Sequence, residues 1–265
     1  MKRFFLTIAI VLFVYDCMEA QDSVSIYKKM ADDGDPIAQY TVGMGYINGL
    51  WGYPQSDEMA VKYFSMASEQ GLDVGQYYLG LCYYEGRGVQ QSFSSAFSWI
   101  KKAAEQGFHV AQNNLGNFYE DGVGTDVSIS DAFYWWRKAA EQGNSDAQYA
   151  LGMHYMKGLG ITQSYEKAFK WFKMAAEQGD TECMNKIATF YMYGMGVEKS
   201  CSDALNWYIL SAENGNVGAQ CILGLMYRDG SECTKQSYTE ALRWLRLAAN
   251  NGDEKAQKYL RELLE

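Results

Sequence analysis

The sequence is poor in histidine and in positive charge. Of its 265 residues only 2 are His, so a three-histidine metal site or a mechanism with several histidine bases has too little material. Lys and Arg together number 23 against 32 for Asp and Glu, which gives a formal net charge of -9. A surface that binds nucleic acid needs an excess of positive charge, so nucleic acid is not an expected partner. With 48% apolar residues the chain is nevertheless expected to fold.

The sequence also lacks an apolar run long enough to span a membrane. Residues 4–15 form a nearly continuous apolar run of 12 residues behind a basic start, and no later segment is long and apolar enough either. A spanning helix needs about 20 apolar residues, whereas a short run of this kind is typical of a signal peptide. We expect residues 1–20 to be a signal peptide and the mature protein to be secreted or periplasmic, without a membrane span. Lipoprotein anchoring at Cys17 is disfavoured, because bulky and acidic residues precede it where such a signal has small ones.

Glycine, in contrast, is abundant, and its placement is periodic. Seven of the 26 glycines recur at intervals of 36 or 37 residues: Gly34, Gly71, Gly107, Gly143, Gly179, Gly215 and Gly252. Small, apolar and aromatic residues then follow at three- to four-residue spacing, as in Ala147-Gln148, Leu151-Gly152 and Tyr155. This spacing predicts one amphipathic helix in each unit, which we name helix A.

A loop and a second helix complete each unit. Four units have a Gly-x-Gly loop, as in Gly122-Val123-Gly124, which suits a chain reversal with positive backbone angles. A serine then precedes the second helix, where we expect it to act as the N-cap: Ser56, Ser92, Ser128, Ser164, Ser200 and Ser237. This helix, named helix B, carries alanines and aromatics at helical spacing and ends on Glu-Gln-Gly in four units. Each unit is therefore predicted to be a hairpin of two helices that buries its apolar face only by stacking on its neighbours.

The combined pattern of Ala-Gln, Leu-Gly-x-x-Tyr, Gly-x-Gly-Val, Ala-x-x-Trp-Phe and Ala-Ala-Glu-Gln-Gly resembles the Sel-one-like repeat, a 36-residue relative of the tetratricopeptide repeat. The resemblance covers residues 35–252 as six repeats and implies an all-α fold, a right-handed α/α superhelix. Residues 21–265 then form a single solenoid with a leading helix at 23–33 and a C-terminal capping helix at 253–265. The loops of the first and sixth repeats depart from Gly-x-Gly and are expected to differ in shape.

The resemblance implies a protein-interaction scaffold or adaptor, not an enzyme. Cysteine-rich relatives have been described as binding or hydrolysing penicillin-type lactams, so a hydrolase or binder of lactam or cell-wall ligands is the alternative function. Two Ser-x-x-Lys motifs, at residues 25–28 and 164–167, match part of a serine acylase signature, but its Lys-Thr-Gly and Ser-Asp-Asn partners are missing. His154 is expected on the core side of its helix. We therefore expect no catalytic residue, cofactor or metal, and a monomer whose partner is a protein or peptide.

Helix A is expected to line a concave groove. The residues on that face vary from unit to unit whereas the packing positions do not, and exposed Tyr and Met are favourable contact residues. The candidate partner-binding residues are Tyr40, Met44, Tyr77, Leu81, Tyr84, Asn113, Asn117, Glu120, Tyr149, Met153, Met156 and Asn185. The amides of Asn113 and Asn117 are expected to hydrogen-bond a ligand backbone. On this interpretation, Asn117→Ala and Tyr149→Ala weaken partner binding and leave the melting temperature nearly unchanged.

Five cysteines follow residue 20, so at least one of them is unpaired. Export permits disulfides. The candidate pairs are Cys201 with Cys233 and Cys183 with Cys221, and five reduced cysteines remain the alternative. Cys82 is expected to be a free and buried thiol.

Overall fold

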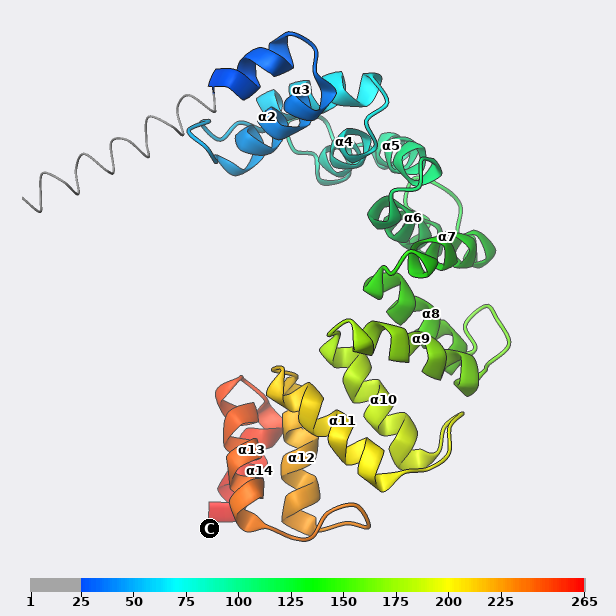
Figure 1. Ribbon diagram of the computed structural model, residues 1–265, viewed down its shortest axis with the longest axis vertical. Coiled ribbons are helices and arrows are strands. Elements are labelled where there is room, and N and C mark those ends of the chain that lie inside the picture. The colour runs from blue at the N-terminus through cyan, green and yellow to red at the C-terminus, as the bar shows by residue number, and fades with distance from the viewer. Residues whose placement is uncertain (1–24, 265) are drawn as a thin grey trace, which may run out of the picture. The chain divides into compact units, whose positions relative to one another are not determined.

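The computed structural model describes residues 25–264, and all regular secondary structure in that range is α-helical (Figure 1). A leading helix covers residues 25–32. It is followed by α2 (Pro36–Asn48), α3 (Asp57–Glu69), α4 (Asp73–Glu85), α5 (Phe93–Glu105), α6 (His109–Asp121), α7 (Ile129–Glu141), α8 (Ser145–Lys157), α9 (Tyr165–Glu177), α10 (Thr181–Tyr193), α11 (Cys201–Glu213), α12 (Val217–Asp229), α13 (Tyr238–Asn250) and α14 (Glu254–Leu264). The all-α fold predicted from the sequence is confirmed. The expected signal peptide, residues 1–20, lies outside the described residues.

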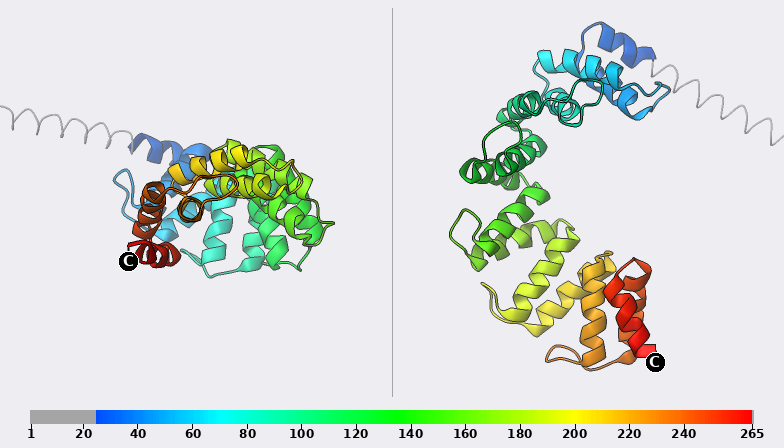
Figure 2. Two further views of the ribbon diagram at one scale, coloured as in Figure 1. Left: turned by 90° about the horizontal axis from the view of Figure 1, so that it is seen from below. Right: turned by 180° about the vertical axis from the view of Figure 1, so that it is seen from behind.

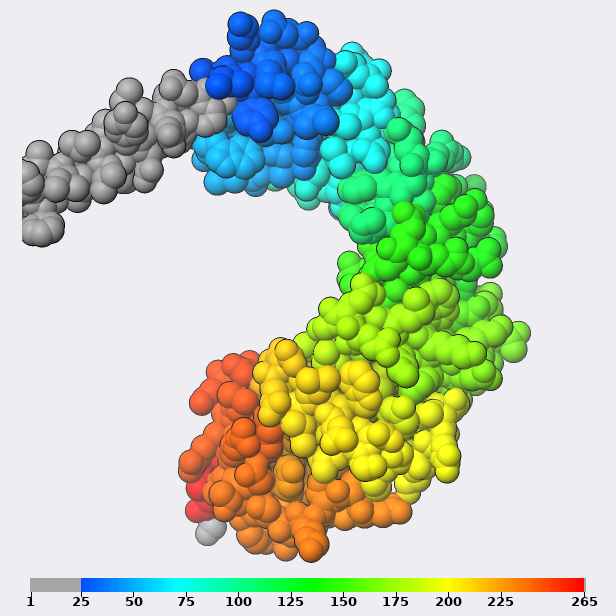
Figure 3. All heavy atoms as spheres, viewed as in Figure 1, coloured from blue at the N-terminus to red at the C-terminus, as the bar shows by residue number. Residues whose placement is uncertain are grey.

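The helices alternate between the two predicted types, with even-numbered helices as helix A and odd-numbered helices as helix B. Consecutive helices pack against each other from α2 to α6 and from α8 to α14. The chain divides into two compact units within α7, between Trp135 and Trp136. We refer to them as the N-terminal and the C-terminal unit. Within each unit the hairpins stack in chain order (Figure 2). Their side chains fill the space between neighbouring hairpins (Figure 3).

A small residue on helix A lets helix B of the same hairpin pack closely against it. A Cβ atom placed on Gly43 lies 2.5 Å from the ring of Phe64, and one placed on Gly152 lies 2.5 Å from the ring of Phe172. Gly80 and Gly224 hold the same position against Ile100 and Leu245. A larger residue at this position therefore pushes the two helices of the hairpin apart.

The glutamine of the Ala-Gln pair joins three helices through buried polar contacts. Gln148 Nε2 donates to the carbonyl of Ala140 at 3.0 Å, in the last turn of the preceding helix B. Its side-chain oxygen accepts from Gln178 Nε2 at 2.8 Å, at the end of the following helix B. The same arrangement occurs at Gln39 (Ala31, Gln70), Gln76 (Ser68, Gln106) and Gln220 (Ala212, Asn251). The Ala-Gln and Glu-Gln-Gly segments that recur along this chain are thus hydrogen-bonded to each other and link neighbouring repeats.

In three of the Gly-x-Gly loops the second glycine packs against the backbone of the preceding repeat. Gly124 has φ 68°, and a Cβ atom there overlaps the carbonyl of Phe93, the first residue of α5. Gly88 and Gly196 make the same approach to the first residues of α3 and α9. These glycines are required both for a positive φ and for space.

The loops of the first and sixth repeats differ from this arrangement. In the sixth, Cys233 bonds to Cys201, the first residue of α11, with the two Cα atoms 4.8 Å apart. The disulfide thus joins the loop to the position that Gly88, Gly124 and Gly196 contact in their own preceding repeats. In the first, Trp51 has φ 54° and is the only non-glycine residue with a positive φ among residues 25–264.

All six predicted serine caps bond the backbone N–H three residues ahead, as from Asp203 N to Ser200 Oγ at 3.3 Å. An N-cap of this kind contributes about 1 kcal/mol to helix stability. The acidic residues three positions on, Asp131 and Asp203, accept a hydrogen bond from the serine hydroxyl at 2.5 Å. Each helix B therefore begins where the serine predicts.

Candidate interaction face and pocket

In the N-terminal unit, the predicted partner-binding residues lie on α2, α4 and α6, on the side that we name the A-helix face. Tyr84 is 38% exposed and Asn117 is exposed, so both are accessible to a partner. The half-buried members are Tyr40, Met44, Tyr77, Leu81 and Glu120. Asn113 is only 6% exposed, which differs from the expectation of an accessible amide.

The tyrosines of this face also pack between neighbouring A helices. The ring centroids of Tyr40 and Tyr78 lie 5.5 Å apart, and burial raises the pKa of Tyr40 to about 12. The hydroxyl of Tyr77 accepts a hydrogen bond from Asn114 Nδ2 at 3.1 Å. These rings therefore stabilise the stack in addition to lining its surface.

Between α2 and α4 the A-helix face is hollowed into a pocket of about 230 Å³. Eight residues line it: Met44, Ile47, Asn48, Tyr78, Leu81, Cys82, Glu85 and Arg87. Apolar side chains form its inner wall, where Ile47 and Cys82 are buried. Polar groups make up about half of its surface, and Asn48 and Glu85 are exposed at its rim. Met44 and Leu81 are among the predicted partner-binding residues. The residues that the sequence did not assign to this face are Asn48, Tyr78, Glu85 and Arg87.

Of the two carboxylates near Arg87 at the pocket rim, only that of Asp57 forms a short ion pair with it. Arg87 Nη2 lies 2.8 Å from Asp57 Oδ1 and donates to the carbonyl of Ile47 at 3.1 Å, so this guanidinium is held by the first turn of α3 and the end of α2. Glu85 is farther from it, with 3.9 Å between Oε2 and Arg87 Nη1. Neither Lys nor Arg occurs in α2, α4 or α6, which carry Asp73, Glu85, Glu120 and Asp121. The A-helix face of this unit is therefore acidic.

Two asparagines at equivalent positions have a buried side-chain oxygen without a hydrogen-bond partner: Asn113 in α6 and Asn185 in α10. A buried polar atom left unpaired costs roughly 1–3 kcal/mol. The sequence places Asn113 on the binding face but does not reveal its burial. A ligand donor that reaches either oxygen removes that cost.

In the C-terminal unit, the predicted residues Tyr149, Met153, Met156 and Asn185 are all half-buried on α8 and α10. The first three pack against a core cluster that contains Phe172 and Phe190. Their accessible surface is smaller than expected, because each long side chain reaches across to the next helix.

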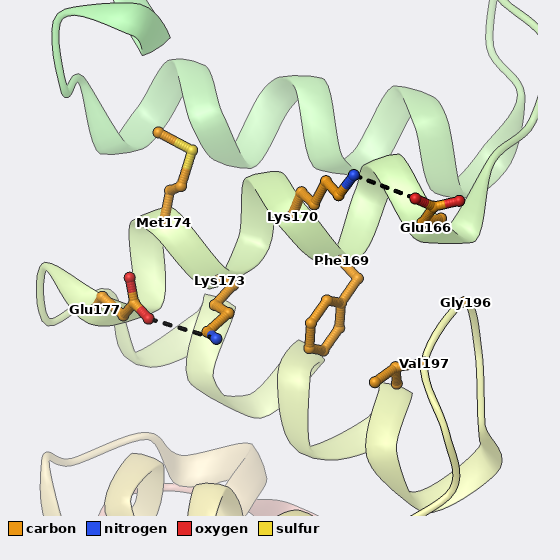
Figure 4. A pocket seen from close by; sticks show the side chains of 8 residues that line it. All are labelled: Glu166, Phe169, Lys170, Lys173, Met174, Glu177, Gly196 and Val197. Atoms are coloured by element: carbon orange, nitrogen blue, oxygen red, sulfur yellow. Dashed lines mark hydrogen bonds and ion pairs between the residues drawn. The ribbon is translucent and has the colours of Figure 1, made fainter.

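A second hollow, of about 500 Å³, lies in the C-terminal unit on α9 and the loop after α10 (Figure 4). Phe169 and Val197 form its apolar part. Its charged residues pair along α9, with Lys170 Nζ 3.1 Å from Glu166 Oε1 and Lys173 Nζ 3.8 Å from Glu177 Oε1. These charges balance one another, so the hollow favours neither sign of ligand charge.

The cysteines form one of the two candidate disulfides. Cys201 and Cys233 are bonded, whereas Cys82, Cys183 and Cys221 are free and buried. The prediction that Cys183 pairs with Cys221 is wrong, because the two side chains enter different core clusters. Burial raises the pKa of all three thiols, in Cys82 to about 11.

The residues named for possible catalysis have structural partners. His154 is 5% exposed, with Nδ1 3.1 Å from the carbonyl of Leu159. Ser164 Oγ accepts from the backbone N–H of Lys167, whose amine lies over the ring of Tyr155. Within residues 25–264 no group of three or more His, Cys, Asp and Glu side chains is arranged to hold a metal ion. None of the helices in the described part of the chain is long and apolar enough to cross a membrane.

Comparison with known proteins identifies the repeat. A family model described as Sel1 repeat matches six segments, residues 36–72, 74–108, 109–144, 145–180, 181–216 and 217–253. The crystal structure of a Sel1 repeat protein from Oxalobacter formigenes is similar, with 30% identity and a TM-score of 0.79. That match covers 90% of this chain and 97% of the other.

Two further relatives are longer than this chain. The protein c5321, a protective antigen of uropathogenic Escherichia coli with an SLR fold, is 36% identical with a TM-score of 0.86, over 91% of this chain and 51% of its own. The rat DAP3-binding cell death enhancer 1 is 39% identical over 75 residues, which are 28% of this chain and 14% of that protein. The chain thus spans about half of the antigen and a small part of the rat protein.

Proposed function

The chain belongs to the Sel1 repeat family, whose members generally act as protein-interaction scaffolds, and from this premise we propose that it binds a peptide or protein loop on its A-helix faces. The observation that carries the proposal is the pocket between α2 and α4 on the predicted face, which has apolar side chains inside and an accessible polar rim. The rat relative, named as DAP3-binding, is consistent with a protein partner.

The proposal is tested by selecting binders from a random peptide library displayed on phage with the purified protein as bait. The same selection on a variant with Tyr84→Ala and Asn117→Ala, two accessible side chains of the A-helix face, is expected to recover these peptides poorly. Ser98→Ala, on the exposed side of helix B α5, is the matched control and is expected to retain them. Peptides that bind all three proteins equally contradict binding on this face.

We further propose that the protein works outside the cytoplasm, as a secreted or periplasmic protein. The disulfide between Cys201 and Cys233 supports this location, because disulfides persist mainly in oxidising compartments. N-terminal sequencing of protein recovered from the native host tests it. A chain that begins near Gln21 is the expected result, and a chain that retains residues 1–20 contradicts it.

The alternative, hydrolysis of a lactam, has no observation in its favour. The serine of one Ser-x-x-Lys motif caps α9, and Lys28 of the other lies 2.7 Å from Asp32. The two lysine amines thus contact the ring of Tyr155 and the carboxylate of Asp32, whereas an acylation base contacts the nucleophilic hydroxyl. We expect the purified protein to leave the lactam nitrocefin intact.

A further inference from the structure

The size of the pocket between α2 and α4 and the charge at its rim favour one kind of partner side chain. At about 230 Å³ it is smaller than the roughly 300–1,000 Å³ of pockets for drug-sized ligands. Met44, Leu81 and the buried Ile47 provide an apolar interior. One large aliphatic or aromatic side chain is therefore a better match for this space than a small-molecule ligand.

The rim of the pocket favours a positive charge beside that side chain. Arg87 is already paired with Asp57, so the carboxylate of Glu85 remains as excess negative charge. Glu85 is the last residue of α4, and the C-terminal end of a helix dipole adds to the negative potential there. No Lys or Arg on α2, α4 or α6 opposes it.

We propose that this pocket binds an apolar side chain of a partner protein that has Lys or Arg one or two residues away. The proposal rests on the proposed function, since it names the segment of the partner that the A-helix face recognises. The apolar side chain enters between α2 and α4, and the neighbouring cation lies beside the exposed carboxylate of Glu85.

Selection from the phage-displayed peptide library, followed by calorimetric titration of the recovered peptides, tests the proposal. The peptides are expected to share an apolar residue with Lys or Arg close to it. Glu85→Lys is expected to weaken their binding about fivefold at low ionic strength, since an exposed charge pair contributes roughly 0.2–1 kcal/mol and the reversal adds repulsion. Asn48→Trp, a change at the exposed rim that blocks the entrance, is expected to weaken it as strongly.

Glu105→Lys is the matched control, because Glu105 ends helix B α5 as Glu85 ends helix A α4 and is likewise exposed. It is expected to leave binding unchanged. Thermal denaturation followed by circular dichroism establishes that all three variants remain folded.

Two results overturn the inference in distinguishable ways. Peptides that depend on Tyr84 and Asn117 but are acidic, or are indifferent to Glu85→Lys and Asn48→Trp, refute the pocket assignment and leave the proposed function intact. Failure to recover any peptide that depends on the A-helix face refutes both.

Discussion

Side chains that the sequence assigns to one face of helix A differ in their surroundings. The first position holds Tyr77, Asn113 and Tyr149, which are half-buried or buried. At the second position, one turn further on, Leu81 and Met153 are half-buried and Asn117 is exposed. Side chains at the first position therefore contribute to stability as well as to the surface, because they reach the next helix.

This difference changes the expected effect of Tyr149→Ala. The ring of Tyr149 lies 6.0 Å from that of Phe172 and packs against the core cluster, so its loss is expected to destabilise the protein by roughly 2–4 kcal/mol. Asn117→Ala is expected to cost less than about 1 kcal/mol and to weaken binding of selected peptides by roughly 1 kcal/mol. Thermal denaturation and titration of each variant separate the two effects. Equal stability of the two variants contradicts this assignment.

The buried thiol of Cys82 gives the protein a pH dependence at alkaline pH. Burial raises its pKa from 9.0 to about 11, so the unfolded chain releases this proton at lower pH than the folded chain does. The stabilising contribution is complete below pH 9 and is lost as the pH rises toward about 11. Urea unfolding at several pH values is expected to show a steeper decline in the wild type than in Cys82→Ala. Parallel declines contradict it.

At the scale of the loops, the contact between a loop and the start of the preceding helix B is made either by close packing or by a disulfide bond. Gly124 reaches the backbone of Phe93 because it has no side chain, and Cys233 reaches the equivalent residue Cys201 through a covalent bond. The sequence predicts the turn at each Gly-x-Gly. It does not show whether glycine is required there for its positive φ or for the lack of a side chain, because either requirement selects glycine. The close approach therefore becomes evident only in the structure.

Two glycine variants separate these two requirements. Gly71 has φ 87° and nothing within 4 Å of an added Cβ atom, so Gly71→Ala is expected to cost only the strain of its backbone, about 1 kcal/mol. Gly124→Ala adds an overlap with the Phe93 carbonyl and is expected to cost roughly 2–4 kcal/mol. Chemical denaturation measures both. Equal losses for the two variants refute a close contact at Gly124.

The disulfide is expected to stabilise the last repeats by roughly 2–4 kcal/mol, since it closes a loop with a sequence separation of 32. The double variant Cys201→Ser, Cys233→Ser is expected to lose that amount in urea unfolding. Ellman's reagent in denaturant is expected to find three thiols in protein that lacks Cys17, from Cys82, Cys183 and Cys221. Five thiols in protein from its native compartment contradict the bond.

At the scale of the whole chain, the 36-residue period was sufficient to predict the helices, their order and their packing residues. The same position in every repeat faces the same neighbours, so Gly43 and Gly152 have one explanation. The binding face was predicted only in part, since its pocket depends on Glu85 and Arg87, whose positions relative to Asp57 are set by packing between repeats. Periodicity reports what the repeats share, whereas a binding site depends on where they differ.

The helices at the two ends of the described chain differ in whether a further helix can pack against them. In the leading helix, Tyr27 and Met30 occupy positions that other B helices bury, and they are 44% and 41% exposed. In α14, Arg261 stands at the position held by Gly224 in α12, where only a small residue admits a helix B. The C-terminal helix thus rejects a further helix B, including the leading helix of a second copy.

We therefore expect the protein to be a monomer and Arg261→Ala to promote association of one copy's α14 with another's leading helix. The fifth repeat has Ala188 at this position, so alanine is small enough for a helix B to pack. Light scattering after gel filtration is expected to give one mass for the wild type at all concentrations, and a mass that rises with concentration for the variant. Arg246→Ala, on the exposed side of α13, is the control and is expected to behave as the wild type. Association of the wild type, or a variant that remains monomeric, contradicts the role of Arg261 as a stop.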